Sequence, residues 1–218
     1  MAPSARLQLA ARDWEILRTL SLCVRMLSLR QISRTWWGCC ESGHQVALDR
    51  LNRLVRGGWL WCRHAFAQPL SPLMSPQASW HSGQWIPDFG PLAWRLRQRW
   101  DCPAEPVKIY LATSRTARHF GGRRRDVIAR PFQIAHDLGV AEMFLAVRQQ
   151  RPHLVRWWID EDRLAPFRRR QKLPDAVLAE SPRAPIQLVL EFGAGYSKQR
   201  LAAFHRDSES RGLPYEIW

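Results

Sequence analysis

The sequence predicts a mixed α+β (α/β) chain that folds as two units. In the N-terminal half, apolar residues recur at helical spacing in three segments and then alternate like a strand. In the C-terminal half, a helical segment over 133–149 precedes three short strand-like runs, a second helical segment and a last strand. A chain of 218 residues can bury a core in each of two domains. We therefore expect domains at 1–122 and 123–218.

The N-terminal helices are expected over 12–22, 29–36 and 42–58. Ser28 precedes the second helix and can cap its free amides. The third helix ends in a Gly-Gly pair, which permits a left-handed C-terminal residue. A strand-like alternation follows over 59–63. Three helices followed by a strand in this order look like a winged helix-turn-helix.

The third helix carries a polar face that suits DNA. This face contains His44, Gln45, Arg50 and Arg53, which can reach base edges and phosphates from a helix in the major groove. Residues 1–66 hold ten arginines against four acids, and the whole chain has a formal net charge of +14. Such an excess favours a polyanionic partner, and double-stranded DNA is the partner we expect. The alternative is an ordinary solvated basic face.

The middle of the chain connects the two expected domains. Residues 68–91 are rich in Pro, Ser, Gly and Trp and predict an irregular excursion that extends the wing. Weak strand-like alternation follows over 92–100, and a clear strand is predicted over 107–112. A short helix is predicted over 114–120, and the basic run 123–125 forms the hinge to the second domain.

The C-terminal half combines strands with spaced carboxylates. Strands are predicted over 153–159, 174–178 and 186–191, and a closing helix over about 197–211 precedes a strand at 213–218. With the helix before them, these elements follow an αβββαβ order that resembles the core of the PD-(D/E)xK restriction-endonuclease-like superfamily. The resemblance covers roughly the last two-fifths of the chain.

This resemblance implies a metal site and the residues that form it. Matched residue by residue, Glu142, Asp175 and Glu191 would hold Mg²⁺ or Mn²⁺ beside a scissile phosphate. The usual lysine position is Gly193, so Lys198 of the next helix is the candidate for a displaced cation. The alternative interpretation is that Asp175 shapes a turn and Glu191 ends an edge strand.

A basic run stands just before Pro174-Asp175. Arg168, Arg169 and Arg170 belong to it and are expected to guide phosphates toward the carboxylates, with a solvated loop as the alternative. Asp137 lies on the same predicted helix as Glu142 and is expected to cap or orient a neighbour, as an alternative to binding metal.

Several short motifs together resemble the replication-relaxation family. They are the Arg-Asp-Trp-Glu-Ile-Leu17 opening, the Leu-Asn-Arg-Leu-Val-Arg-Gly-Gly-Trp-Leu60 helix end, Ile109-Tyr-Leu-Ala-Thr113, Ala135-His-Asp-Leu138 and Pro174-Asp175. Members are associated with plasmids and other mobile elements, and pair a winged helix with a nuclease-like domain. The resemblance implies a DNA-binding accessory protein for replication, mobilisation or transposition.

Two alternatives and several exclusions accompany this expectation. The alternatives are an active Mg²⁺-dependent endonuclease that uses Lys198, and a dimeric transcription regulator in which the nuclease-like domain forms a homodimer interface. Replication or mobilisation proteins are further expected partners. No secretory signal or membrane-spanning run is visible, so we expect a cytoplasmic protein without membrane contact.

Cysteine and tryptophan usage leaves two smaller questions open. The five cysteines lack framework spacing, as expected of a reducing compartment. A zinc site can be drawn from Cys39, Cys40, His44, Cys62 and His64, although adjacent cysteines suit zinc poorly. The 12 tryptophans are expected mainly in cores, with stacking on unpaired bases as the alternative.

Overall fold

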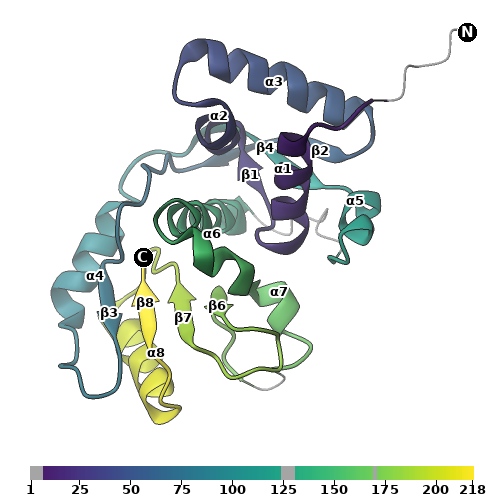
Figure 1. Ribbon diagram of the computed structural model, residues 1–218. Coiled ribbons are helices and arrows are strands. Elements are labelled where there is room, and N and C mark those ends of the chain that lie inside the picture. Colours follow the sequence, from purple (N-terminus) through teal and green to yellow (C-terminus); the bar gives the residue numbers. More distant parts are fainter. Residues whose placement is uncertain (1–6, 124–130, 169–170) are drawn as a thin grey trace, which may run out of the picture. The chain divides into compact units, whose positions relative to one another are not determined.

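The computed structural model describes residues 7–123, 131–168 and 171–218 (Figure 1). The chain divides into two compact units, and neither is a continuous stretch of sequence. The first unit takes Met1–Phe66 and Pro106–Ile134, and the second takes Ala67–Glu105 and Ala135–Trp218. Each unit mixes helices with a small sheet, so the predicted α+β composition is confirmed.

The first unit follows the element order expected from the sequence, with one additional two-residue strand, β1. Its helices are α1 (Ala11–Leu22), α2 (Leu29–Trp37), α3 (Glu41–Arg56) and α5 (Ser114–His119). Its strands are β1 (Leu27–Ser28), β2 (Leu60–Ala67) and β4 (Glu105–Ala112). They form a three-stranded sheet in the order β1-β4-β2, with β1 antiparallel to β4. The predicted helices and strands of this half are confirmed to within a few residues.

Local sequence signals explain where these helices begin and end. The Ser28 hydroxyl accepts a hydrogen bond from the Gln31 amide at 3.1 Å, and the Gln31 side chain accepts one from the Ser28 amide at 2.9 Å. This reciprocal pair satisfies amides that a helix start leaves free. Gly58 follows α3 with φ of 71°, a conformation that costs glycine little. Between the helices, Ile16, Leu20, Ile32 and other fully buried apolar residues form the core.

The second unit has one five-stranded sheet and several helices. Its strands are β3 (Ala78–Trp80), β5 (Trp158–Asp160), β6 (Ala176–Leu178), β7 (Leu188–Glu191) and β8 (Tyr215–Ile217). Its helices are α4 (Phe89–Gln98), α6 (Pro131–Gln150), which begins in the first unit, the 3₁₀ helix η1 (Pro152–Trp157), α7 (Glu161–Leu164) and α8 (Lys198–Ser210).

The sheet of the second unit has the order β3-β8-β7-β6-β5. Strands β5, β6 and β7 form an antiparallel meander, whereas β7 and β8 are parallel. A parallel pair needs a crossover, and α8 supplies it. The predicted order of helix, three strands, helix and strand is therefore present in α6, β5, β6, β7, α8 and β8.

Two elements differ from the sequence prediction. The strand expected over 153–159 is mostly η1, and β5 begins only at Trp158. The weak alternation over 92–100 is helix α4, which buries Leu92, Ala93 and Leu96 on one face at helical spacing. This face belongs to a core cluster that also contains Leu201 and Phe204 of α8.

The segment between β2 and β4 also differs from expectation. Residues 68–91 were expected to be an irregular extension of the wing, and the domain boundary was expected at 122/123. The structure instead gives this segment strand β3, which pairs antiparallel with β8 of the second unit. An insertion between two strands of the first unit therefore completes the sheet of the second unit.

Two whole-chain expectations can be compared with the described residues. No helix among them is long and apolar enough to cross a membrane. Cys39 and Cys40 are exposed, and Cys62 is partly buried. Within the described ranges, no group of three His, Cys, Asp or Glu side chains lies in an arrangement that holds a metal ion. The zinc alternative therefore gains no support.

Candidate functional site

The expected acidic pair, Asp175 and Glu191, lies where strand β6 begins and its antiparallel neighbour β7 ends. Ala176 pairs with Leu190 in the sheet, so the two acids occupy the next position of the ladder. The Asp175 amide donates to Glu191 Oε2 at 3.2 Å, and the Phe192 amide donates to Asp175 Oδ2 at 2.8 Å. Each carboxylate thus bonds the backbone of the opposite strand. These two hydrogen bonds hold β6 and β7 together beyond the last backbone pair of the sheet, and we call this arrangement the carboxylate clasp.

His136 of α6 lies between two carboxylates of this region. Its Nε2 is 3.2 Å from Asp175 Oδ1, and its Nδ1 is 3.7 Å from Asp137 Oδ1. Burial by itself lowers the pKa of His136, but the interactions with Asp137 and Asp175 outweigh it and raise this pKa to about 10. The imidazole is therefore a cation at neutral pH, and Asp137 lies where it can orient that ring.

Glu191 is bonded on its other side to Tyr196 and, through it, to Arg200. The Tyr196 hydroxyl donates to Glu191 Oε1 at 2.5 Å, and Arg200 Nη2 donates to the same hydroxyl at 2.8 Å. The Arg200 guanidinium also lies 3.7 Å from the centroid of the Tyr196 ring. Burial first, and the charge of Asp175 second, raise the pKa of Glu191 to about 8. Both causes favour the protonated form of Glu191.

These contacts can be tested against the needs of a divalent cation. Each of the four oxygens of Asp175 and Glu191 already has a protein partner: His136, the Phe192 amide, Tyr196 or the Asp175 amide. A hard cation needs free, ionised carboxylate oxygens, so it would have to displace these hydrogen-bond donors and the imidazole that faces Asp175. Glu142 is buried on α6 but does not form a three-member ligand group with them within the described residues. This arrangement does not fit Mg²⁺ or Mn²⁺.

Side-chain packing leaves little space at Gly193, the position where the nuclease motif has lysine. A Cβ atom at Gly193 would lie 2.7 Å from Leu96 Cδ1 and 2.8 Å from Ile217 Cγ2. Both neighbours are fully buried, so the core leaves no room for a side chain there. Glycine at 193 is therefore required by the approach of α4 to the sheet.

The nearby cations are arranged differently from the prediction. Lys198 is exposed in the first turn of α8. Arg200, two residues later, is the cation that reaches Glu191 through Tyr196. Of the basic run, Arg168 donates to the Ala184 carbonyl at 3.2 Å, and Arg169 and Arg170 lie outside the described residues.

Some of the α3 residues that were predicted to contact DNA form hydrogen bonds within the protein, and others are exposed without an ion-pair partner. His44 Nδ1 lies 3.2 Å from the Ser33 hydroxyl, and Gln45 donates to Asp49 Oδ1 at 3.2 Å. Arg53 is exposed and forms no ion pair with a described residue. Arg56, one turn later, is also exposed. The open cations of α3 are therefore in its last turns.

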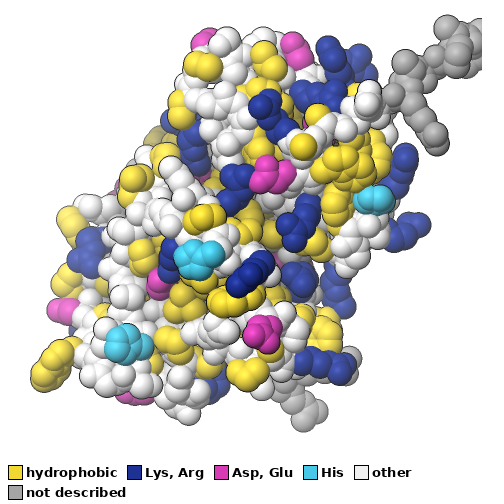
Figure 2. All heavy atoms as spheres, in the orientation of Figure 1, with side chains coloured by type: hydrophobic (Ala, Val, Ile, Leu, Met, Phe, Trp, Pro, Cys, Tyr) yellow, Lys and Arg dark blue, Asp and Glu magenta, His cyan; other side chains and the backbone are white. Residues whose placement is uncertain are grey.

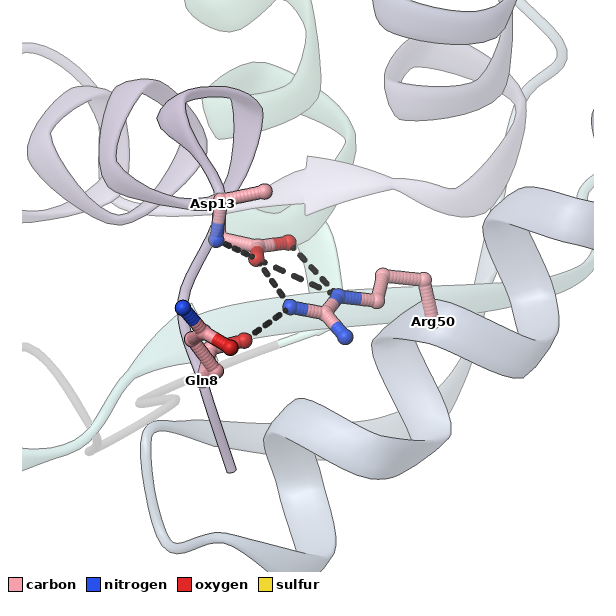
Figure 3. Close-up of polar contacts among 4 residues, drawn as sticks. Gln8, Asp13 and Arg50 are labelled. Carbon is pink, nitrogen blue, oxygen red and sulfur yellow. Dashed lines mark hydrogen bonds and ion pairs between the residues drawn. The ribbon is translucent and has the colours of Figure 1, made fainter. Parts of the chain in front are cut away.

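Arg50 has a structural contact that the sequence analysis missed (Figure 3). Its guanidinium contacts both oxygens of Asp13 on α1, with Nε 3.0 Å from Oδ1, and donates through Nη2 to the Gln8 carbonyl at 2.7 Å. The Asp13 side chain is 1% exposed and also accepts from the Ala10 amide at 2.7 Å. The hydrogen bond with Asp13 raises the pKa of Arg50. Arg50 therefore fastens α3 to the start of α1.

The sequence offered partial signals for the residues it missed. His136 precedes Asp137 in the quoted Ala135-His-Asp-Leu138 motif, and Tyr196 and Arg200 are four residues apart, which is the spacing of neighbours on a helix. Nothing in the sequence indicates that Asp13 and Arg50, 37 residues apart, meet.

Comparison with protein-family models, curated protein sequences and solved structures found no match for this chain. The functional interpretation therefore depends on two features of the described residues. One is the open basic end of α3, and the other is the carboxylate clasp formed by Asp175 and Glu191 with His136 and Tyr196.

Proposed function

We propose that the chain is a double-stranded DNA-binding protein whose first unit is a winged helix that uses α3 as its recognition helix. One observation carries the proposal. The order α1-β1-α2-α3-β2-β4, with β1 antiparallel to β4, is the order expected of a winged helix whose recognition helix is α3, and α3 exposes Arg53 and Arg56. The formal net charge of +14 supports a polyanionic partner.

The second unit, in this proposal, is a restriction-endonuclease-like domain that serves binding or assembly. Its support is the αβββαβ order, in which α8 joins the parallel strands β7 and β8. The clasp argues for a role without cleavage, because its carboxylates are occupied by protein donors and by an imidazolium. The motifs shared with the replication-relaxation family favour an accessory role in replication, mobilisation or transposition of a mobile element.

The test of duplex binding is fluorescence anisotropy with a labelled 20-base-pair duplex across a salt series. Replacing Arg53 and Arg56 together by Gln should weaken binding by about 1–3 kcal/mol for each base that either arginine reads, or reduce the salt slope by about 1 for each phosphate that either neutralises. The matched control is Arg95→Gln with Arg97→Gln, which removes the same charge from the exposed face of α4. Unchanged affinity and slope in the α3 variant would remove the recognition-helix assignment.

A metal-dependent endonuclease is the second candidate, because Asp175 and Glu191 lie on neighbouring strands as that chemistry requires. Plasmid nicking with Mg²⁺ or Mn²⁺ separates the two candidates. The proposal expects no nicking by the wild-type protein. Nicking that Asp175→Ala abolishes would replace the binding-only role by an enzymatic one.

A further inference from the structure

An aromatic cluster lies at the surface of the first unit where α1 meets α5. Trp14 is 37% exposed, and its ring centroid lies 5.9 Å from Trp59, 5.2 Å from His119 and 5.8 Å from Phe120. His119 is exposed, whereas Trp59 and Phe120 are half-buried. Figure 2 shows a broad hydrophobic area over α1 and α5, with a histidine and Lys or Arg side chains around it.

Three arginines surround this cluster. Arg18 lies one turn after Trp14 on α1, and Arg115 and Arg118 lie on α5; all three are exposed. The Arg115 guanidinium lies 4.9 Å from the Trp59 ring centroid. None of the three forms an ion pair with a described residue. We call the seven side chains the aromatic–arginine face: Trp14, Arg18, Trp59, Arg115, Arg118, His119 and Phe120.

The nearest acids of α1 do not neutralise this face. Asp13 is held by Arg50, and Glu15 accepts a hydrogen bond from Trp36 Nε1 at 2.9 Å. The face therefore combines open aromatic surface with cations that have no acidic partner in the described part of the chain. Exposed tryptophans occur elsewhere, Trp85 and Trp94 among them, so exposure alone does not distinguish it. The face is distinguished by the several rings that meet at Trp14 beside exposed arginines.

Hydrogen bonds beneath the face connect α5 to the start of β2. Thr116 of α5 donates from its hydroxyl to the Trp59 carbonyl at 2.6 Å, and the Thr113 hydroxyl donates to the Gly58 carbonyl at 2.9 Å. These bonds fix α5 and the start of β2 relative to each other. A surface that is fixed before binding loses less conformational entropy when a ligand arrives.

We propose that the aromatic–arginine face binds an unpaired stretch of DNA, in addition to the duplex that α3 is proposed to bind. Flat rings stack on nucleobases, and arginines beside them neutralise phosphates, which together suit a single strand. In a duplex, the base faces are covered by neighbouring base pairs, so Trp14 gains a partner only where bases are unpaired. Acidic protein would match the charge but would not supply successive flat rings.

The experiment measures binding of the full chain to a labelled 20-nucleotide single strand and to its 20-base-pair duplex by anisotropy. Trp14→Ala should weaken single-strand binding on the order of 10-fold and leave duplex binding within about twofold. Trp14→Phe, which keeps a ring, should retain most of the affinity. Circular dichroism melting shows whether each variant is folded.

Arginine variants give a second readout that does not disturb the ring packing of Trp14. Arg115→Gln with Arg118→Gln should reduce the slope of the single-strand salt dependence by about 0.7 for each phosphate that these arginines neutralise. The control is again Arg95→Gln with Arg97→Gln, which should leave that slope unchanged. An effect of equal size in the two double variants would contradict a specific face.

Failure of this inference is separable from failure of the proposed function. Absence of single-strand binding by the wild-type chain, or equal losses for both DNA forms in folded Trp14→Ala, would overturn the inference alone. A change from oligomer to monomer in Trp14→Ala without a change in single-strand affinity would make the face a protein interface and would also overturn it. Unchanged duplex binding in the Arg53 and Arg56 variant would overturn the α3 assignment alone.

Discussion

Each unit contains a buried acid with a basic partner, and the two clusters balance charge differently. In the first unit one carboxylate, Asp13, faces one guanidinium, Arg50, and backbone donors complete its bonding. In the second unit Asp175 contacts the imidazole of His136 directly, whereas Glu191 reaches a cation, Arg200, only through the Tyr196 hydroxyl.

The difference lies in whether the buried acid contacts a cation directly. Burial penalises any charge without an opposite partner, so a carboxylate without a direct cation takes up a proton more readily. In the second unit the acid that does so is Glu191, which is 3% exposed and whose pKa is raised to about 8. The one-to-one cluster of Asp13 and Arg50 is expected to connect α1 to α3, whereas the cluster around Glu191 is expected to change its protonation near neutral pH.

The largest effect should come from breaking the one-to-one cluster. Arg50→Ala leaves the carboxylate of Asp13 buried without its cation, which should lower the free energy of unfolding by about 3–5 kcal/mol. Urea unfolding followed by circular dichroism measures it. Arg53→Ala on the same helix is the control and should change stability by less than about 0.5 kcal/mol. Equal effects of the two substitutions would show that the Asp13 ion pair contributes little.

A smaller loss is expected when the cation of the second cluster is removed. His136→Ala should lower the free energy of unfolding by about 2 kcal/mol, because the freed carboxylates can relieve part of the cost by taking up a proton. His153→Ala in η1 removes an exposed histidine and should have almost no effect. If His136→Ala is as stable as His153→Ala, the imidazolium does not hold the clasp.

A third effect is a change in the slope of stability with pH. Glu191 keeps its proton to about pH 8 in the folded chain but only to about 4.5, its ordinary pKa, when unfolded, so the folded state binds more protons between these values. Stability from this group is complete below pH 4.5 and is lost as pH rises toward 8. Glu191→Gln cannot titrate and should flatten the curve in that window. Parallel curves for wild type and Glu191→Gln would assign the slope to other groups.

Local sequence patterns predicted most of the fold, because the elements concerned carry their own signals. The Ser28 cap and the glycines after α3 located the ends of helices that the structure confirms. Helix α4 was missed because its short amphipathic face, with Leu92 and Leu96, follows a Pro- and Gly-rich segment that resembles a loop. The partner that stabilises it, α8, is about 100 residues away in sequence.

Predicting the candidate site depended even more on distant contacts. Asp175 and Glu191 were placed on neighbouring strands, and the structure pairs them there. His136 contacts Asp175 because α6 packs beside the sheet, and the spacing of residues in the sequence does not reveal this packing. The same holds for Arg50, whose polar position on α3 suggested DNA while its partner Asp13 lies on another helix.

The insertion of β3 and α4 between β2 and β4 has a consequence for how the chain can be divided. The polypeptide passes from one unit to the other three times, after Phe66, Glu105 and Ile134. A single cut therefore never yields two complete units: a fragment ending at Phe66 lacks β4, and a fragment beginning at Ala135 lacks β3 and the helix that closes over Gly193. The two units are interleaved along the chain, so no single boundary separates one from the other.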